Sequence, residues 1–414
     1  MTDHTRPQLA APFWGERYSE THVLSDVIAP PYDVISPVER ETLSRKHEHN
    51  IVHLVLPEGE GDRYARAAAL LAEWRNAGVF ERDKSPSVYV LRQSFATPMG
   101  RQCERTGVIV GLLAESFSEG RVRPHERTHQ GPKEDRLSLL RATRAMFEAI
   151  FVLARDEGGE LAARLEAEAA RRPTARAELH GVSLALWRVP AKRARTLADV
   201  ASSGPVYVAD GHHRFETAVA FRAELPEAER IPALVVPVGD PGLVVLATHR
   251  RVRGKPVDPE WLIEQLRDRF QVRELRPSAN YVEELSELAG RGTSALVVFP
   301  PGRGFAFLLK GGAGLGDVRF SNEPAVASLD VARIDEIIVR RVQEAAGSGA
   351  TVDYSADPHA VIDAVRAGDA AAGILLNPAT VEDVLTVADE GGVMPPKSTY
   401  FMPKVPSGLV VAGY

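Results

Sequence analysis

Apolar positions along the chain follow two spacings, one typical of strands and one typical of helices. Runs of β-branched and other apolar residues predict strands, whereas apolar residues three or four positions apart predict helices. The predicted strands are 51–59, 87–97, 105–117, 149–154, 181–189, 206–208, 231–239, 243–250, 293–299 and 305–310. The predicted helices are 64–80, 134–148, 157–172, one beginning just after Asp210, 261–272, 330–345, 359–367 and 380–388. This mixture of elements indicates an α+β fold.

The chain is long enough to form more than one hydrophobic core. It has 414 residues, whereas domains usually have about 100–200. A linker at 251–259, with Gly254 and Pro256, predicts a boundary that divides residues 1–255 from 256–414. The prolines and lysines of the C-terminal segment, MPPKSTYFMPKVPSGLV, argue against a helix there.

Charge and cysteine content narrow the possible partners. The formal net charge is −6, so the sequence has no overall excess of cations with which to neutralise a nucleic-acid backbone. Cys103 is the single cysteine, which excludes intrachain disulfides and cysteine-rich metal sites. No stretch reaches about 18 consecutive apolar residues, and the N-terminus lacks the pattern of a secretion signal. We therefore expect a cytoplasmic protein with a small-molecule substrate, without a nucleic-acid or membrane partner.

The stretch VYVADGHHRFETA, residues 206–218, has the strongest functional pattern. A β-branched run leads into Asp210 and Gly211, and a helical pattern then begins with His212, His213 and Arg214. Free backbone N–H groups and the positive end of the helix dipole favour an anion at such a helix start, and arginine can bind a phosphate with two hydrogen bonds. Adjacent histidines lie about 100° apart on a helix, which makes a single metal shared by both less natural. The alternative is that Asp210 only caps the helix.

The stretch RPHERTHQGPKEDR, residues 123–136, is a polar loop that leads into a helix. A carboxylate among cations can stay ionised and act as a base, and Glu126 lies among His125, Arg127 and His129. The spacing of His125 and His129 could serve a metal only on a helix, against which the Gly and Pro of the loop argue. The alternative is a solvated, charged loop.

Two further stretches have weaker patterns. In APPYDVIS, residues 29–36, consecutive prolines fix an extended segment that could display Tyr32 and Asp33. In PPKSTYFMPK, residues 395–404, cations and hydroxyls could bind an anion while an aromatic ring stacks; the residues are Lys397, Ser398, Thr399, Tyr400 and Lys404. Each stretch could also be an ordinary turn or tail. The sequence has no P-loop, no dinucleotide-binding fingerprint after a strand, no HExxH and no protein-kinase motif set.

The stretches APPYDVIS, PHERTHQGPKEDR, ADGHHRFETA and MPPKSTYFMPK together resemble the bacterial and archaeal family catalogued as domain-of-unknown-function 1015. That family is distantly similar to the ParB/sulfiredoxin superfamily, in which free L-serine kinases have known chemistry. The resemblance implies a ParB/sulfiredoxin-like mixed core with an insertion near 137–200. It also implies an additional α/β C-terminal part, which would return a Lys-rich tail towards the site.

The resemblance also implies roles for individual residues. Glu126 would accept the proton of the serine hydroxyl, and Asp210 would assist it or contact Mg²⁺. Phosphate would be bound by Gly211, His212, His213, Arg214, His125 and Arg127. Tyr32, Asp33, Lys397, Ser398, Tyr400 and Lys404 would contact substrate.

We therefore predict a phosphotransferase that acts on a hydroxyl metabolite such as free serine, with Mg²⁺ and a nucleotide or pyrophosphate as donor. One alternative is a ParB-like regulatory protein that binds nucleotide or DNA. The other is a metal-dependent phosphohydrolase with Asp210, His212, His125 and His129 as ligands.

Overall fold

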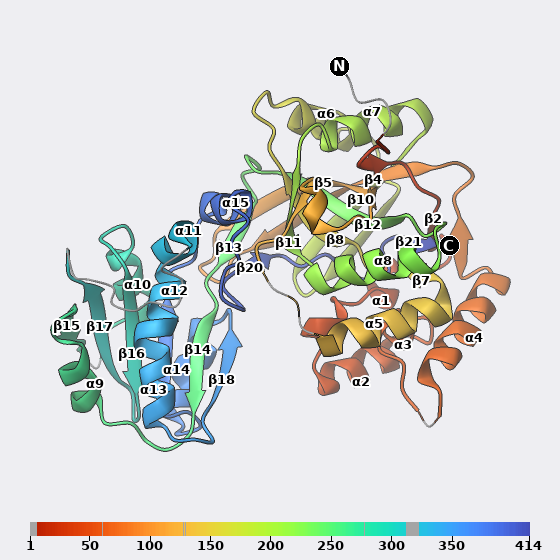
Figure 1. Cartoon of the computed structure of the whole chain (residues 1–414). Coiled ribbons are helices and arrows are strands. Elements are labelled where there is room, and N and C mark those ends of the chain that lie inside the picture. The colour runs from red at the N-terminus through yellow and green to blue at the C-terminus, as the bar shows by residue number, and fades with distance from the viewer. Residues whose placement is uncertain (1–5, 60, 127, 129, 277, 312–322) are drawn as a thin grey trace. The chain divides into compact units, whose positions relative to one another are not determined.

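The chain forms two compact units (Figure 1). The computed structural model describes residues 6–59, 61–126, 128, 130–276, 278–311 and 323–414. Unit 1 comprises Met1–Pro124, Thr128–Leu243 and Pro403–Tyr414, and unit 2 comprises His125–Arg127 and Val244–Met402. The sequence pattern suggested a boundary further along, at 251–259. Residues 249–253 form a strand in the sheet of unit 2, which explains why the boundary lies before them, at residue 244.

The main sheet of unit 1 has nine strands and both strand directions. Its order is β6-β11-β8-β12-β5-β4-β10-β9, and β1 pairs with β5. The pairs β6–β11 and β8–β12 are parallel, and the other pairs are antiparallel. The bounds are β1 Ala10–Ala11, β4 Ser87–Ala96, β5 Gln102–Leu113, β6 Val122–Arg123, β8 Ile150–Ala154, β9 Ala175–Leu179, β10 Val182–Pro190, β11 Val206–Asp210 and β12 Arg230–Pro237. Every residue of β8 is buried, as expected for a central strand covered on both faces.

Helices pack against this sheet and against one another. Helix α8 contacts β8 and β12, whereas α6 and α7 contact β4, β5 and β10. Helix α5 runs alongside α8 and also contacts α4 (Figure 1). The bounds are α4 Arg63–Asn76, α5 Gln130–Thr143, α6 Glu160–Ala169, α7 Ala191–Ala201 and α8 His212–Glu224.

Residues 24–76 form a helical layer whose core also includes residues from later in the chain. Helices α1 Leu24–Val27, α2 Pro37–Lys46 and α3 Val52–Val55 and the 3₁₀ turn η1 Tyr32–Val34 precede α4. A four-stranded sheet in the order β3-β2-β21-β7 adjoins them: β2 Gly15–Tyr18, β3 Phe80–Arg82, β7 Ala145–Met146 and β21 Val411–Gly413. The core includes Tyr18, Val52, Leu71, Trp74 and Phe80.

The predicted strand at 51–59 was wrong, because Val52–Val55 is a helical turn. Val52, Leu54 and Val55 are all buried, and a short apolar run fits a buried helix as well as a strand. The Asn50 side chain accepts a hydrogen bond from the Val52 N–H at 3.0 Å, which starts the turn.

Three predicted helices extended into strands. Helix α4 ends at Asn76, and Phe80 belongs to β3. Helix α5 ends at Thr143, and Arg144 then takes a positive φ of 47° before β7. Helix α9, Pro259–Leu266, is followed by a turn into β15, Phe270–Glu274, where Phe270 pairs with Leu309.

Unit 2 has a six-stranded antiparallel sheet in the order β15-β17-β16-β19-β14-β18. Its strands are β14 His249–Arg253, β15 Phe270–Glu274, β16 Ser294–Phe299, β17 Arg303–Leu309, β18 Thr351–Ser355 and β19 Ala372–Leu376. A separate pair joins β13 Val244–Leu246 to β20 Tyr400–Met402. The helices are α9 Pro259–Leu266, α10 Tyr281–Leu288, α11 Pro324–Ser328, α12 Asp330–Ile334, the π-helical turn η3 Asp335–Val339, α13 Arg340–Ala345, α14 Pro358–Arg366 and α15 Val381–Asp389.

The protein is thus a mixed α/β structure with several sheets, as the sequence pattern predicted in outline. Within the described residues, no helix combines the length and the apolar character needed to cross a membrane.

Candidate active site

The turn from β11 to α8 positions the strongest sequence motif. β11 ends at Asp210, Gly211 adopts φ 92°, and α8 begins at His212. Any other side chain at Gly211 would be strained by this φ, and its Cβ would lie 2.8 Å from the Ile150 side chain. The predicted strand, tight turn and helix are therefore confirmed at this point.

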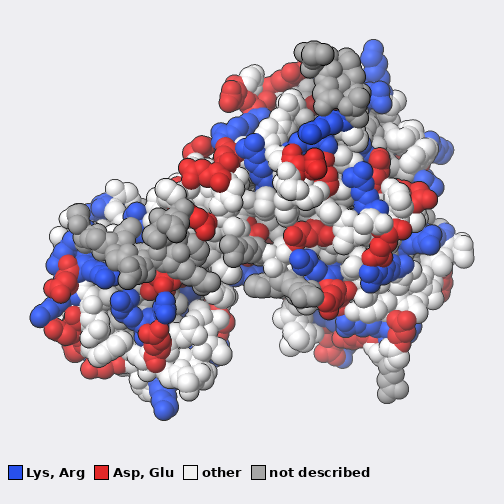
Figure 2. All heavy atoms as spheres, in the orientation of Figure 1, with Lys and Arg blue, Asp and Glu red and all other residues white. Residues whose placement is uncertain are grey.

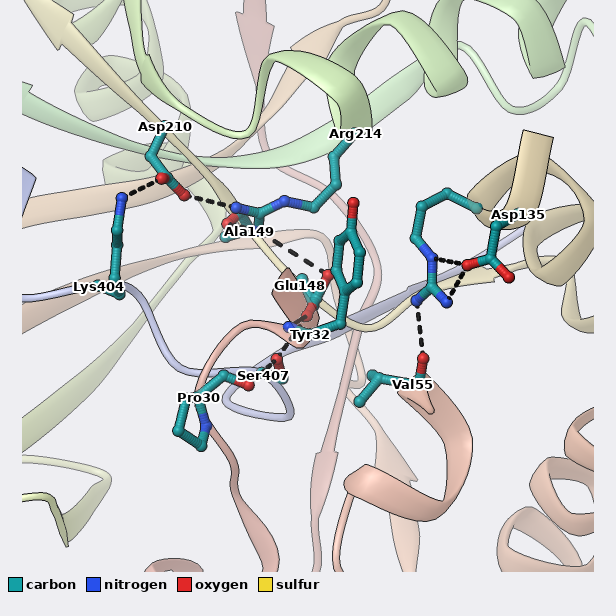
Figure 3. A network of polar contacts seen from close by, with 11 residues as sticks. Pro30, Tyr32, Val55, Asp135, Glu148, Ala149, Asp210, Arg214, Lys404 and Ser407 are labelled. Atoms are coloured by element: carbon teal, nitrogen blue, oxygen red, sulfur yellow. Dashed lines mark hydrogen bonds and ion pairs between the residues drawn. The ribbon is translucent and has the colours of Figure 1, made fainter. Parts of the chain in front are cut away.

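Asp210 accepts from two cations (Figure 3). Arg214 Nη2 donates to Oδ2 at 2.6 Å, and Lys404 Nζ donates to Oδ1. Burial alone would raise the pKa of Asp210, but Lys404 and Arg214 hold this pKa well below its usual range. The carboxylate therefore stays ionised at neutral pH and holds an arginine and a lysine at the start of α8.

Arg214 is buried and has three partners in unit 1. Besides Asp210, its Nη1 donates to the Ala149 carbonyl at 2.9 Å and lies 4.0 Å from Glu148 Oε2. Burial alone would lower the pKa of Arg214, but the carboxylates of Glu148 and Asp210 raise it above its ordinary value. Arg214 is therefore a fixed positive charge.

Glu148 connects the APPY segment to the C-terminal tail. Its Oε1 accepts from the Tyr32 backbone N–H at 2.9 Å and lies 2.7 Å from Ser407 Oγ, which is also 3.0 Å from the Pro30 carbonyl (Figure 3). Glu148 is only 6% exposed. The sequence analysis missed Glu148 and Ser407, because their partners are distant in the sequence and neither belongs to a recognisable motif.

Arg136 fixes the ring of Tyr32. Its guanidinium lies 4.1 Å from the centre of that ring, and Nη1 donates to the Val55 carbonyl at 2.7 Å. Nε donates to Asp135 Oδ2 at 2.8 Å. Burial, together with the nearby Asp33 carboxylate, raises the pKa of the Tyr32 hydroxyl well above its usual range. Asp33 itself is exposed.

Arg105 was also missed by sequence reasoning. It is fully buried on β5, its guanidinium lies 4.4 Å from the ring centre of Phe151, and Nη2 donates to the Pro403 carbonyl at 2.6 Å. Burial lowers the pKa of Arg105 to about 9, with partial compensation from Asp240 and Asp210. The signal that could have identified Arg105 is a charged residue at the start of the buried part of β5.

His125 and Glu126 lie in unit 2, against the segment that precedes β20. The Met394 N–H donates to the His125 carbonyl at 2.8 Å, and His125 Nε2 lies 3.0 Å from Thr399 Oγ1. Glu126 Oε1 accepts from the Lys397 backbone N–H at 3.3 Å. Lys397 has a positive φ of 57°, a strained backbone conformation for a side chain of this kind.

The sequence-predicted residues therefore divide into two groups. The group in unit 1 consists of Tyr32, Asp33, Gly211, His212, His213 and the bonded set Asp210, Arg214 and Lys404. His125, Glu126, Lys397, Ser398 and Tyr400 belong to unit 2, where Ser398 is buried and donates to the Pro395 carbonyl at 2.6 Å. Arg127 and His129 lie outside the described residues.

The structure gives a partial view of metal binding. Among the described residues, no group of three or more His, Cys, Asp and Glu side chains is placed to hold a metal ion. His129 lies outside the described residues, so the predicted four-ligand set is not tested in full. Asp210 could contact Mg²⁺ only by sharing oxygens that already accept from Lys404 and Arg214.

Charges of both signs are mixed on the visible surface. On the face in Figure 2, Lys and Arg side chains are interspersed with Asp and Glu. The expectation that nucleic acid is not a partner stays a prediction.

The solved structures that match this chain have low identity to it. A free serine kinase in complex with AMP is 16% identical, with a TM-score of 0.37, and the match covers 72% of this chain and 90% of that chain. A conserved hypothetical protein from Pyrococcus furiosus is 17% identical, with a TM-score of 0.35 and coverage of 72% and 93%. SbnI with a C-terminal truncation, from Staphylococcus aureus, is 14% identical, with a TM-score of 0.37 and coverage of 72% and 87%. These TM-scores are too low to carry a functional argument.

No curated protein matches this sequence. The family described as "Protein of unknown function (DUF1015)" matches residues 10–332, which is more than half of the chain. This match agrees with the resemblance of the four sequence stretches, and the chain belongs to the DUF1015 family.

Proposed function

We propose that this protein is a phosphotransferase that transfers a phosphoryl group to the hydroxyl of a small metabolite, with free serine as the first candidate. The observation that carries the proposal is the ion-paired group of Asp210, Arg214 and Lys404 at the start of α8. Phosphoryl transfer depends mainly on positioning and on neutralising phosphate charge. Fixed cations beside a helix start supply both.

The proposal gives each candidate residue a role. Arg214, Lys404, His212 and His213 would bind the donor phosphates, and Asp210 would orient the two cations that it holds. Glu126 would act as the general base. The acceptor oxygen forms a bond to the terminal phosphorus of the donor, the bond from that phosphorus to the bridging oxygen breaks, and the hydroxyl proton passes to Glu126.

Mg²⁺ would enter with the donor, since Mg²⁺ in such sites is bound largely by phosphates and water. When bound, it would neutralise phosphate charge. This assignment fits a site in which the Asp210 carboxylate is already paired with cations.

The proposal includes a ParB/sulfiredoxin-like core with an insertion near 137–200 and an additional C-terminal part, after which the tail returns to complete the site. The ion pair of Lys404 with Asp210 supports the role of the tail. Arg105 and Gln93 support it as well, because they donate to the carbonyls of Pro403 and Lys404.

The test is an assay of the purified protein with serine, Mg²⁺ and either ATP, ADP or pyrophosphate. We expect O-phosphoserine with at least one donor, and loss of turnover in Glu126→Ala and Asp210→Ala. Unchanged turnover in both variants would overturn the proposal.

A further inference from the structure

A pocket of about 580 Å³ lies in unit 1 between the 3₁₀ turn η2, Phe117–Glu119, and helices α5 and α8. Its walls include the aromatic rings of Phe117 and Phe215, the apolar side chains of Leu137 and Val219, and the charged groups of Lys133 and Glu216. Sites for small organic ligands usually have about 300–1,000 Å³ and combine apolar walls with a few polar groups. The pocket has the size and the composition of such a site.

The aromatic side of the pocket suits a flat ring. Phe117 and Phe215 are stacked, with ring centres 5.1 Å apart and planes inclined by 25°. Phe215 is fully buried, whereas Phe117 is partly exposed and lines the pocket. The buried ring therefore holds the orientation of the exposed one, and a planar heterocycle can pack against it.

The polar side of the pocket suits vicinal hydroxyls. Glu216 accepts from Lys133 Nζ at 3.1 Å and from Thr128 Oγ1, and both bonds end on Oε2. A carboxylate has a second oxygen with which it can accept further hydrogen bonds. A carboxylate fixed in this way is the group that recognises ribose hydroxyls in nucleotide sites.

The pocket and the proposed phosphate-binding residues share helix α8, which supplies Phe215 and Glu216 to the pocket walls. Glu216 follows His212 by four residues, so both lie on one face of the helix. At about 1.5 Å per residue they are about 6 Å apart along the helix axis. A nucleoside diphosphate covers a span of this kind between its ribose and its terminal phosphate.

We propose that this pocket binds the base and ribose of a nucleoside di- or triphosphate, the base against Phe117 and the ribose hydroxyls on Glu216. The proposal rests on the proposed function, since it takes this nucleotide to be the phosphoryl donor. It decides between the two donor classes, because pyrophosphate has neither a ring nor a ribose.

The test is calorimetric titration of the full-length protein, in Mg²⁺, with ADP, 2′,3′-dideoxy-ADP and pyrophosphate. We expect Phe117→Ala to weaken ADP binding about tenfold, a typical loss for one base stacked on an aromatic ring, and to leave pyrophosphate binding unchanged. Phe117→Trp retains ADP binding. Glu216→Gln loses the preference for ADP over its dideoxy analogue.

The matched control is Glu224→Gln. Glu224 lies on the same helix outside the pocket, forms an exposed ion pair with Arg141, and should leave all three affinities unchanged. The pocket proposal is overturned if Phe117→Ala leaves ADP binding intact, or if ADP and pyrophosphate weaken together.

The two proposals fail in different ways. If serine is phosphorylated from pyrophosphate and ADP does not bind, the pocket proposal is wrong and the phosphotransferase stands. If ADP binds with the expected variant pattern but no donor phosphorylates a hydroxyl metabolite, the pocket proposal stands and the proposed function is wrong.

Discussion

Asp210 in unit 1 and Glu126 in unit 2 are held in different ways. Asp210 is bonded to the side chains of Arg214 and Lys404, so its charge is locked between two opposite charges. Glu126 accepts from a backbone N–H, that of Lys397. A carboxylate that holds two cations is suited to organise phosphate-binding groups, whereas the proposed general base, Glu126, is held by a backbone N–H. We therefore propose charge positioning as the role of Asp210 and proton transfer as the role of Glu126.

The largest expected effect is that of Asp210→Asn. The variant leaves Arg214 and Lys404 without their shared negative charge, and removing one partner of a buried ion pair typically costs about 3–5 kcal/mol. We expect a loss of this size in the free energy of unfolding, measured by urea denaturation, together with loss of turnover. The control is Asp353→Asn. Asp353 also pairs with two arginines, Arg251 and Arg253, but it is more exposed than Asp210, so this variant should cost less than about 1 kcal/mol. Equal losses in the two variants would contradict the account of Asp210.

Glu126→Gln should separate activity from stability. Loss of a general base lowers turnover by about 10²–10⁴-fold, and the amide oxygen can still accept from the Lys397 N–H. We expect kcat to fall within this range and the free energy of unfolding to stay within about 0.5 kcal/mol. The control is Glu264→Gln, at an exposed surface ion pair of unit 2. If Glu126→Gln lowered the free energy of unfolding as much as Asp210→Asn does, the proposed difference in role between Glu126 and Asp210 would be wrong.

His249, in unit 2, is a buried histidine whose pKa differs from its usual value. Burial and the neighbouring Arg250 lower its pKa to about 4, with Asp357 in partial opposition, and its Nδ1 accepts from the Leu376 N–H at 3.2 Å. The unfolded chain, with a histidine pKa of about 6.5, binds the proton first. The stabilising contribution is therefore complete above about pH 6.5 and is lost as the pH falls towards 4.

We expect this loss to be on the order of 2 kcal/mol in wild type and to be absent in His249→Gln. The measurement is hydrogen exchange of β14 and β19 peptides between pH 7 and 4, corrected for the intrinsic rates. The exposed His359 supplies the control variant, His359→Gln. An identical pH response in wild type and His249→Gln would show that His249 is not held neutral.

The smallest expected effect is that of Ser407→Ala. This change removes the hydroxyl beside Glu148 and the Pro30 carbonyl, and leaving a buried acceptor with one bond fewer costs about 1–3 kcal/mol. The exposed Ser328 donates only to a carbonyl three residues earlier, and Ser328→Ala should be nearly neutral. Thermal unfolding of both variants checks this, and no difference between them would mean that Ser407 does not tie the tail to Glu148.

Local structure was predictable where pattern and turn chemistry agreed. The β-branched run before Asp210, followed by Gly211, correctly predicted the turn between β11 and α8. The run 51–59 misled, because its periodicity fits a buried helix as well as a strand.

The contacts within the site were less predictable than its motifs. Glu148 acts through residues 32 and 407, which are more than a hundred positions away in either direction, and no local pattern reports such pairings. Lys404 was predicted as an anion-binding or substrate contact, whereas its ion pair with Asp210 depends on how the C-terminal tail joins unit 1.

The central claim is that a phosphoryl group passes to a hydroxyl metabolite with the charges of unit 1 as its binding groups. The most direct measurement is transfer of ³²P from labelled donor to serine, with enzyme in excess, in wild type and Asp210→Asn. The account predicts labelled O-phosphoserine from wild type and none above background from the variant. Label released only as inorganic phosphate, or transferred equally by both proteins, would contradict it.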